Sequence, residues 1–89
     1  MKKVYDYYQD KSHGWLKVSL KELVDLDIHK NISKYSYINK LFVYLEEDSD
    51  APKFIQAKKN LGVDIKVREH VARERYSKIR SYFSYIKEV

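Results

Sequence analysis

Residues 15–23 have the sequence Trp15-Leu16-Lys17-Val18-Ser19-Leu20-Lys21-Glu22-Leu23, in which a strand signal is followed directly by the start signal of a helix. The first four residues include an aromatic and a β-branched side chain, which favour a strand. Ser19 and Glu22 have the spacing of a capping box, in which the Ser side chain accepts a hydrogen bond from a backbone amide of the first helical turn. A strand followed by a short helix over residues 20–26 is therefore predicted.

The preceding residues predict that this strand belongs to a β-hairpin. Val4–Tyr8 is rich in aromatic residues, as a half-buried strand is, and residues 9–14 are polar and end in Gly14. Residues 33–46 predict a second hairpin, in which Ser33–Ile38 and Leu41–Glu46 pair antiparallel around a tight turn at Asn39-Lys40.

A helix and a strand are predicted next. Asp50 can cap a helix that has Pro52 in its first turn and that ends at Gly62. Residues 63–67 then alternate between apolar and charged side chains, which indicates a half-buried strand.

The last segment has the spacing of an amphipathic helix. Its apolar residues follow each other at intervals of four and three, which places them along one line of a helix. They are Ala72, Tyr76, Ile79, Phe83 and Ile86. The expected order is therefore ββαββαβα, which is an α+β fold in one domain over residues 1–89, with an antiparallel or mixed sheet of about five strands and three helices.

Composition excludes several classes of protein. The chain has 89 residues, and it has no apolar run near the roughly 20 residues that a membrane helix needs. Without cysteine it has no disulfide, thiolate zinc site or cysteine nucleophile. It contains no nucleophile elbow, Walker loop, GxGxxG or HExxH motif. We therefore expect a soluble cytoplasmic protein that is not an enzyme and that has no cofactor, no metal, no small-molecule substrate and no membrane partner.

Positive charge is concentrated in the C-terminal part of the chain. Residues 1–50 carry 8 Lys and 9 acidic residues, for a net charge of −1, whereas residues 51–89 carry 10 basic and 4 acidic residues, for a net charge of +6. All four arginines lie within residues 68–80. Arginine suits phosphate and carboxylate groups because its guanidinium is a planar fork of donors. A solvated helix face is the alternative interpretation of these charges.

Tyrosine is unusually frequent, with nine in the chain, and we expect some of them to be exposed. Exposed Tyr together with Arg is typical of surfaces that bind proteins or unpaired bases. The candidate residues for binding nucleic acid or another partner are Arg68, Arg73, Arg75, Lys78, Arg80, Tyr82, Tyr85 and Lys87. A possible second partner surface comprises Tyr35, Tyr37, Glu46, Glu47 and Asp48.

The acidic segment 46–50 allows a metal site, an acidic patch for a basic partner, or a capping role at the following helix. Its spacing lacks the Gly and the distal Glu of a calcium loop, which favours the capping role. His13 and His70 are the candidate general bases, but the sequence offers no residue that would orient either of them, and turn or solvated positions are expected.

Four segments resemble a family of small bacteriophage and mobile-element proteins that has no assigned activity. These segments are His13–Val18, Ile32–Tyr37, Tyr44–Pro52 and Tyr76–Tyr82. The resemblance implies an accessory protein of the bacterial host's cytoplasm that binds or inhibits host machinery, as counter-defence proteins such as anti-CRISPRs do.

These observations predict a non-enzymatic binding module. Its basic Arg and Tyr surface would engage a nucleic acid or a nucleoprotein machine. The alternative is a purely protein-directed inhibitor or adaptor that docks on a host protein without contacting nucleic acid.

Overall fold

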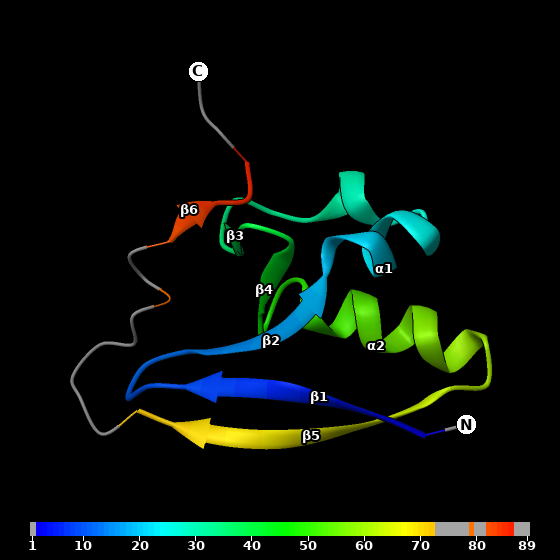
Figure 1. Ribbon diagram of the computed structural model, residues 1–89, viewed down its shortest axis with the longest axis horizontal. Helices are drawn as coiled ribbons and strands as arrows, with labels where there is room; N and C mark the ends of the chain where they lie inside the picture. Colours follow the sequence, from blue (N-terminus) through cyan, green and yellow to red (C-terminus); the bar gives the residue numbers. More distant parts are fainter. Residues whose placement is uncertain (1, 73–78, 80–81, 87–89) are drawn as a thin grey trace.

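The computed structural model describes residues 2–72, 79 and 82–86, and within these residues it forms one mixed sheet with helices packed on one face (Figure 1). The elements are β1 (Lys2–Gln9), β2 (Gly14–Ser19), α1 (Leu20–Asp25), the 3-10 turn η1 (His29–Asn31), β3 (Tyr37–Asn39), β4 (Phe42–Glu46), α2 (Ala51–Asn60), β5 (Asp64–Val71) and β6 (Phe83–Ser84). The described strands lie in the order β5-β1-β2-β4-β3-β6.

The first hairpin and the first helix form as the sequence predicts. β1 and β2 are antiparallel, with Tyr8 opposite Trp15. The backbone amide of Glu22 donates to the Ser19 hydroxyl, at 3.2 Å, and α1 begins directly after Ser19. β5 returns beside β1 in parallel, so the sheet is mixed.

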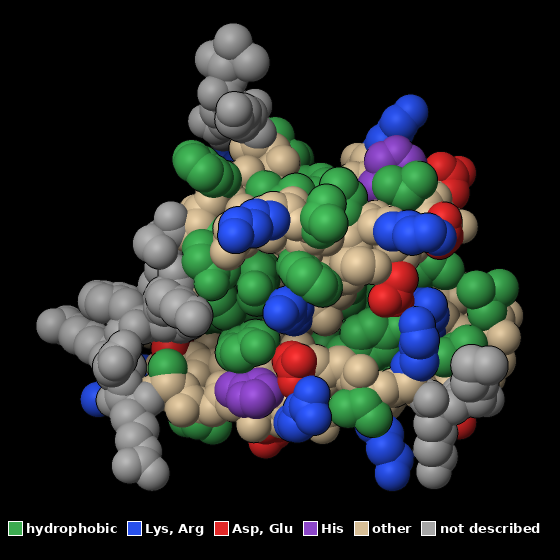
Figure 2. Space-filling model, in the orientation of Figure 1, with side chains coloured by type: hydrophobic (Ala, Val, Ile, Leu, Met, Phe, Trp, Pro, Cys, Tyr) green, Lys and Arg blue, Asp and Glu red, His purple; other side chains and the backbone are tan. Residues whose placement is uncertain are grey.

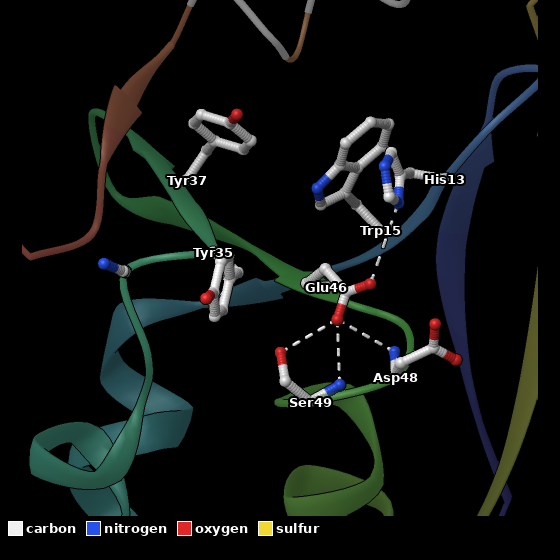
Figure 3. A pocket seen from close by; sticks show the side chains of 8 residues that line it. His13, Trp15, Tyr35, Tyr37, Glu46, Asp48 and Ser49 are labelled. Atoms are coloured by element: carbon white, nitrogen blue, oxygen red, sulfur yellow. Dashed lines mark hydrogen bonds and ion pairs between the residues drawn. The ribbon is translucent and has the colours of Figure 1, made fainter.

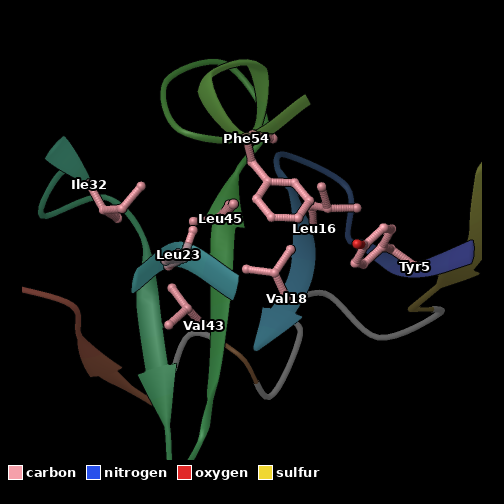
Figure 4. Packing of buried hydrophobic residues seen from close by; sticks show 9 residues of the cluster. Tyr5, Leu16, Val18, Leu23, Ile32, Val43, Leu45 and Phe54 are labelled. Atoms are coloured by element: carbon pink, nitrogen blue, oxygen red, sulfur yellow. The ribbon is translucent and has the colours of Figure 1, made fainter. Parts of the chain in front are cut away.

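The main core lies between the sheet and its two α-helices (Figure 4). Leu16 and Val18 from β2 pack with Leu23 of α1 and Phe54 of α2, and all four are at most 2% exposed. The ring of Tyr5 meets the Phe54 ring edge-on, with 5.3 Å between centroids. Because side chains alternate along a strand, the neighbouring residues point to the opposite face of the sheet.

The second hairpin is shorter than predicted. Its first strand begins at Tyr37 rather than at Ser33, and the turn consists of Lys40 and Leu41, with Lys40 at φ 58°. Ser33 and Ser36 do not pair in the sheet, because both donate from their hydroxyls to the buried carboxylate of Asp50. Ser side chains that bond a nearby acceptor compete with strand pairing in this way.

Asp50 occupies the predicted position before α2, but its side chain caps no amide of that helix. Its carboxylate is fully buried and accepts from the backbone amide and the hydroxyl of Ser33, from the Ser36 hydroxyl and from Lys53 Nζ. Burial alone would raise the pKa of Asp50, but these hydrogen bonds outweigh it and hold the pKa below its ordinary value. The residue therefore ties the segment 33–36 to the start of α2.

The prediction of a final helix that reaches Ile86 is wrong. Phe83 and Ser84 form β6, which pairs with β3, and Phe83 is 75% exposed instead of sharing a buried line with Ile79. Ile79 is buried against Trp15 and Tyr44, on the face of the sheet opposite α1 and α2. The backbone edge of β3 pairs with the backbone of β6. A helix could not pair with this edge, because its own backbone groups are already hydrogen-bonded within the helix. The first part of the predicted helix, residues 73–78, lies outside the described residues.

Candidate functional site

The face of the sheet opposite α1 and α2 combines aromatic and basic side chains, and we call it the aromatic face. Strand register places these residues on one side, since Tyr8 is paired with both Trp15 and His70, Asp6 with Arg68, and Lys17 with Tyr44. Its residues are Val4, Asp6, Tyr8, Trp15, Lys17, Tyr37, Phe42, Tyr44, Lys66, Arg68 and His70. Over β1 and β5, Figure 2 shows hydrophobic, basic, acidic and histidine side chains lying next to one another.

At the β5 edge, one carboxylate positions two nitrogen-bearing side chains. Arg68 Nε donates to Asp6 Oδ1 at 2.8 Å, and His70 Nε2 lies 3.0 Å from the same oxygen. The hydrogen bond from Arg68, followed by that from His70, lowers the pKa of Asp6 to about 2. The His70 ring also stacks on Tyr8, with 4.7 Å between centroids and 17° between planes. A flat ring and a guanidinium are thus held side by side at the surface.

Toward the other end of β2, Lys17 and Phe42 form a second pair of cation and ring. Lys17 Nζ lies 4.3 Å from the centroid of the Phe42 ring, which is within the range of a cation–π interaction. Phe42 is 43% exposed, although it is a large apolar side chain. Neither side chain belongs to a buried cluster, so this pair is available for contact.

Between these two pairs the aromatic face is a packed layer. Trp15 and Tyr44 are buried there with Ile79, and Tyr82 packs on Tyr44 with 5.0 Å between ring centroids. Burial, followed by the proximity of Tyr82, raises the pKa of Tyr44 to about 12. The layer gives the exposed rings a rigid support.

A cavity of about 420 Å³ opens beside this layer, where the 33–37 and 46–49 segments meet the start of β2 (Figure 3). We call it the acidic cavity, and it is lined by His13, Trp15, Lys34, Tyr35, Tyr37, Glu46, Asp48 and Ser49. In Figure 3 the two tyrosines lie across from Trp15 and His13, with the Glu46 carboxylate between them.

Glu46 organises the acidic end of the cavity. Its Oε2 atom accepts from the backbone amides of Asp48 and Ser49, at 3.0 and 2.8 Å, and from the Ser49 hydroxyl, at 2.8 Å. Its Oε1 atom lies 4.0 Å from His13 Nδ1. The Glu46 side chain therefore structures the turn before α2. The acceptor groups of Glu46 and Asp50 bond no backbone amide of α2, so the helix-capping role expected from the sequence is not found in the described residues.

One carboxylate oxygen from each of Glu46, Glu47 and Asp48 lies within 4.8 Å of the others. Two of these three groups already accept hydrogen bonds, because Glu47 accepts from the Tyr7 hydroxyl and Glu46 from the turn. That the segment binds no metal stays a prediction.

The structure separates the residues predicted as the main binding surface. Arg68 and Tyr82 lie on the aromatic face, but Tyr85 packs against the main core, and its hydroxyl donates to the His29 carbonyl. Tyr82 and Tyr85, which were predicted to belong to one binding surface, therefore lie in different parts of the fold. Five further predicted residues lie outside the described residues: Arg73, Arg75, Lys78, Arg80 and Lys87.

The predicted second surface is largely brought together. Tyr35, Tyr37, Glu46 and Asp48 line the acidic cavity, whereas the Glu47 side chain is directed to Tyr7 of β1. Sequence reasoning did not assign the other residues of the aromatic face to a binding surface. They are Val4, Asp6, Tyr8, Trp15, Lys17, Phe42, Tyr44, Lys66 and His70. Strand alternation could have found them, since Tyr8 and Trp15 face away from the core residues Tyr5 and Leu16.

Comparisons with known proteins find no matching family model, no matching curated protein and no matching solved structure. Among the residues that the structure describes, no helix is long and apolar enough to span a membrane.

Proposed function

We propose that this protein is a non-enzymatic binding module whose aromatic face binds single-stranded nucleic acid, alone or as part of a nucleoprotein complex. Such sites combine rings on which bases stack with cations that neutralise the phosphate backbone. The observation that carries the proposal is the exposed Phe42 ring with Lys17 Nζ 4.3 Å from its centroid.

The stacked rings of Tyr8 and His70 extend this surface across the sheet. Tyr8 is on β1 and Phe42 is on β4, the two strands that flank β2. Tyr8 pairs with Trp15 and Phe42 pairs with Ser19, so the two rings are offset by four residues along β2. Strand spacings of about 4.8 Å and a rise of about 3.3 Å per residue put the two rings about 16 Å apart. Arg68, which is 68% exposed on its side chain, lies beside the Tyr8 end. A strand of several nucleotides could contact both rings.

Charge limits where the backbone can run. Glu46 and Asp48 lie at the acidic cavity, and Trp15 lies between this cavity and the pair of Lys17 and Phe42. The carboxylates of Glu46 and Asp48 repel phosphate. The Asp6 carboxylate on β1 is already paired with Arg68 and His70. The path therefore runs over β5, β1, β2 and the Phe42 end of β4, and avoids the Glu46 end of β4.

The test is fluorescence anisotropy with labelled single-stranded DNA and RNA and a matched duplex, from about 25 to 300 mM salt. Phe42→Ala should weaken single-strand binding about fivefold or more, because stacking contributes about 1–3 kcal/mol per base. Arg68→Ala should also lower the salt slope by about one. Lys59→Ala on α2 is the charge-matched control and should behave as the wild type.

Absence of binding to any of these nucleic acids at low salt would refute the proposal. So would equal affinity of the wild type and Phe42→Ala. Tyr35→Ala, at the acidic cavity, should leave nucleic-acid binding unchanged, which distinguishes the aromatic face from the acidic cavity.

The second candidate function is a protein-directed inhibitor or adaptor. The gathering of Tyr35, Tyr37, Glu46 and Asp48 around one cavity favours it, because an acidic aromatic surface fits a basic partner. A protein interface centred on the Tyr side chains should weaken only mildly with salt, whereas nucleic-acid binding should weaken steeply. The resemblance to bacteriophage and mobile-element proteins supports a counter-defence role under either function.

A further inference from the structure

The acidic cavity has the chemistry of a site for an organic cation. Its walls carry three aromatic side chains, and of these Tyr35 is 61% exposed at the surface. Tyr37 meets the Trp15 ring nearly edge-on, with 6.1 Å between centroids and 64° between planes. Trp15 is 2% exposed, so it supports the cavity and Tyr35 forms the accessible wall. Aromatic rings attract cations through the negative charge of their faces.

The polar lining adds negative charge. The Glu46 carboxylate is held in place by the three hydrogen bonds to Oε2, while its Oε1 accepts no hydrogen bond from the described residues. Asp48 lies exposed at the same end of the cavity. A carboxylate fixed in this way next to aromatic walls stabilises a positive charge without having to move.

The chain itself shows that one of these rings receives a cation. Lys34 Nζ lies 5.8 Å from the Tyr35 centroid, within the range of a cation–π contact. Lys34 also lines the cavity, so it competes with any cation that enters.

An alkylated ammonium fits this lining better than a metal ion. Calcium and magnesium need six or more oxygen ligands, and half of the Glu46 carboxylate is already occupied. An alkylated ammonium spreads its charge over methyl groups and needs only ring faces and one carboxylate. We propose that the acidic cavity binds an alkylated ammonium group, carried by a small quaternary amine or by a methylated lysine side chain.

Trp15 is the single tryptophan of the chain and supports the cavity, so its fluorescence reports binding directly. The probes are choline, N-acetyl-trimethyllysine amide, N-acetyl-lysine amide, and the neutral choline isostere 3,3-dimethylbutanol. Choline and the trimethyllysine probe should give saturable changes. Tighter binding of the trimethyllysine probe than of choline would identify a protein side chain as the source, and the reverse order a free amine.

Variants connect the signal to the cavity. Tyr35→Ala and Asp48→Asn should each weaken binding about two- to tenfold, the range expected for one partly exposed cation contact. Both side chains are exposed, so the fold should persist. Lys34→Ala should strengthen binding by removing the competing cation, with Lys30→Ala as the matched control. Phe42→Ala, outside the cavity, should have no effect.

Two results would overturn the proposal. One is the absence of a saturable change with both alkylated probes up to about 10 mM. The other is equal affinity for choline and its neutral isostere, which would show that the cavity takes apolar groups regardless of charge.

Discussion

Asp50→Asn tests a buried carboxylate that ties the segment 33–36 to the start of α2. The carboxylate is fully buried, and its Oδ2 atom accepts from the Ser33 amide at 3.0 Å, the Ser33 hydroxyl at 2.6 Å and the Ser36 hydroxyl. Oδ1 accepts from Lys53 Nζ at 3.0 Å. An amide in its place removes the charge and puts two N–H donors against groups that already donate.

The expected cost follows from these contacts. Hydrogen bonds to a charged group contribute about 1.5–3 kcal/mol each, and a buried donor left without an acceptor costs about 1–3 kcal/mol. The amide that replaces the carboxylate can still accept through its one oxygen, so we expect Asp50→Asn to lower the free energy of unfolding by about 3 kcal/mol at pH 7. This is a large part of the total stability, which for small domains is about 5–15 kcal/mol.

The pH dependence gives a second readout. Because the folded pKa of Asp50 is below its ordinary value, the carboxylate contributes stability above the unfolded pKa, near 3.9, and loses it as the pH falls through the folded pKa. The amide of the variant does not titrate. The difference in unfolding free energy between the wild type and Asp50→Asn should therefore be largest at neutral pH and should shrink below about pH 4.

Urea unfolding followed by Trp15 fluorescence at several pH values measures both quantities. Asp64→Asn, at an exposed carboxylate, is the control and should change stability by no more than about 0.5 kcal/mol. The reasoning is refuted if Asp50→Asn has the same midpoint of urea unfolding as the wild type at pH 7. It is refuted equally if the difference between the two proteins does not shrink in acid.

Further substitutions test the other structural inferences. Ser19→Ala should lower the free energy of unfolding by about 1 kcal/mol through loss of the cap of α1, with no effect on partner binding. Phe54→Ala should cost about 3–5 kcal/mol, measured by thermal unfolding, because the ring is fully buried between α2 and the sheet. Gly14→Ala should cost about 1–3 kcal/mol, because a Cβ there would overlap the Tyr7 hydroxyl. Calorimetry with magnesium, manganese and calcium should show no binding tighter than millimolar at residues 46–48, and a micromolar site lost in Glu46→Gln would contradict this.

Local signals predicted most of the element order from the sequence. The capping box at Ser19 and the polar connection predicted over residues 9–14 each act within a few residues, and the helix and the hairpin form as expected. The connection itself is shorter, residues 10–13, because Gln9 and Gly14 pair in the sheet. The parallel pairing of β5 with β1 was not predictable in this way, because it joins residues about sixty positions apart. The role of Asp50 was missed for the same reason, since its partners Ser33 and Ser36 lie in another segment.

The C-terminal segment shows where periodicity fails. The spacing of Ile79, Phe83 and Ile86 suits a helix, yet Ile79 is buried while Phe83 and Ile86 are exposed. The competing interaction is the backbone edge of β3, to which Phe83 and Ser84 pair. The apolar spacing shows which side chains a helix in this segment could bury. Pairing with the edge of β3 places Phe83 and Ser84 in a strand instead, and the burial of the segment follows from that strand.

The aromatic face and the acidic cavity beside it carry opposite charge, and the two proposals rest on this difference. On the aromatic face Lys17 lies over the Phe42 ring and Arg68 lies near Tyr8, whereas in the acidic cavity Glu46 and Asp48 lie near Tyr35 and Tyr37. A ring stacks on a base or holds a cation with the same π-face, so the neighbouring charge selects between the two ligands. Trp15 belongs to the packed layer of the aromatic face and also lines the acidic cavity, so the proposed anion-binding and cation-binding surfaces would lie side by side. A nucleoprotein, which carries phosphates and basic side chains together, offers both kinds of ligand at once.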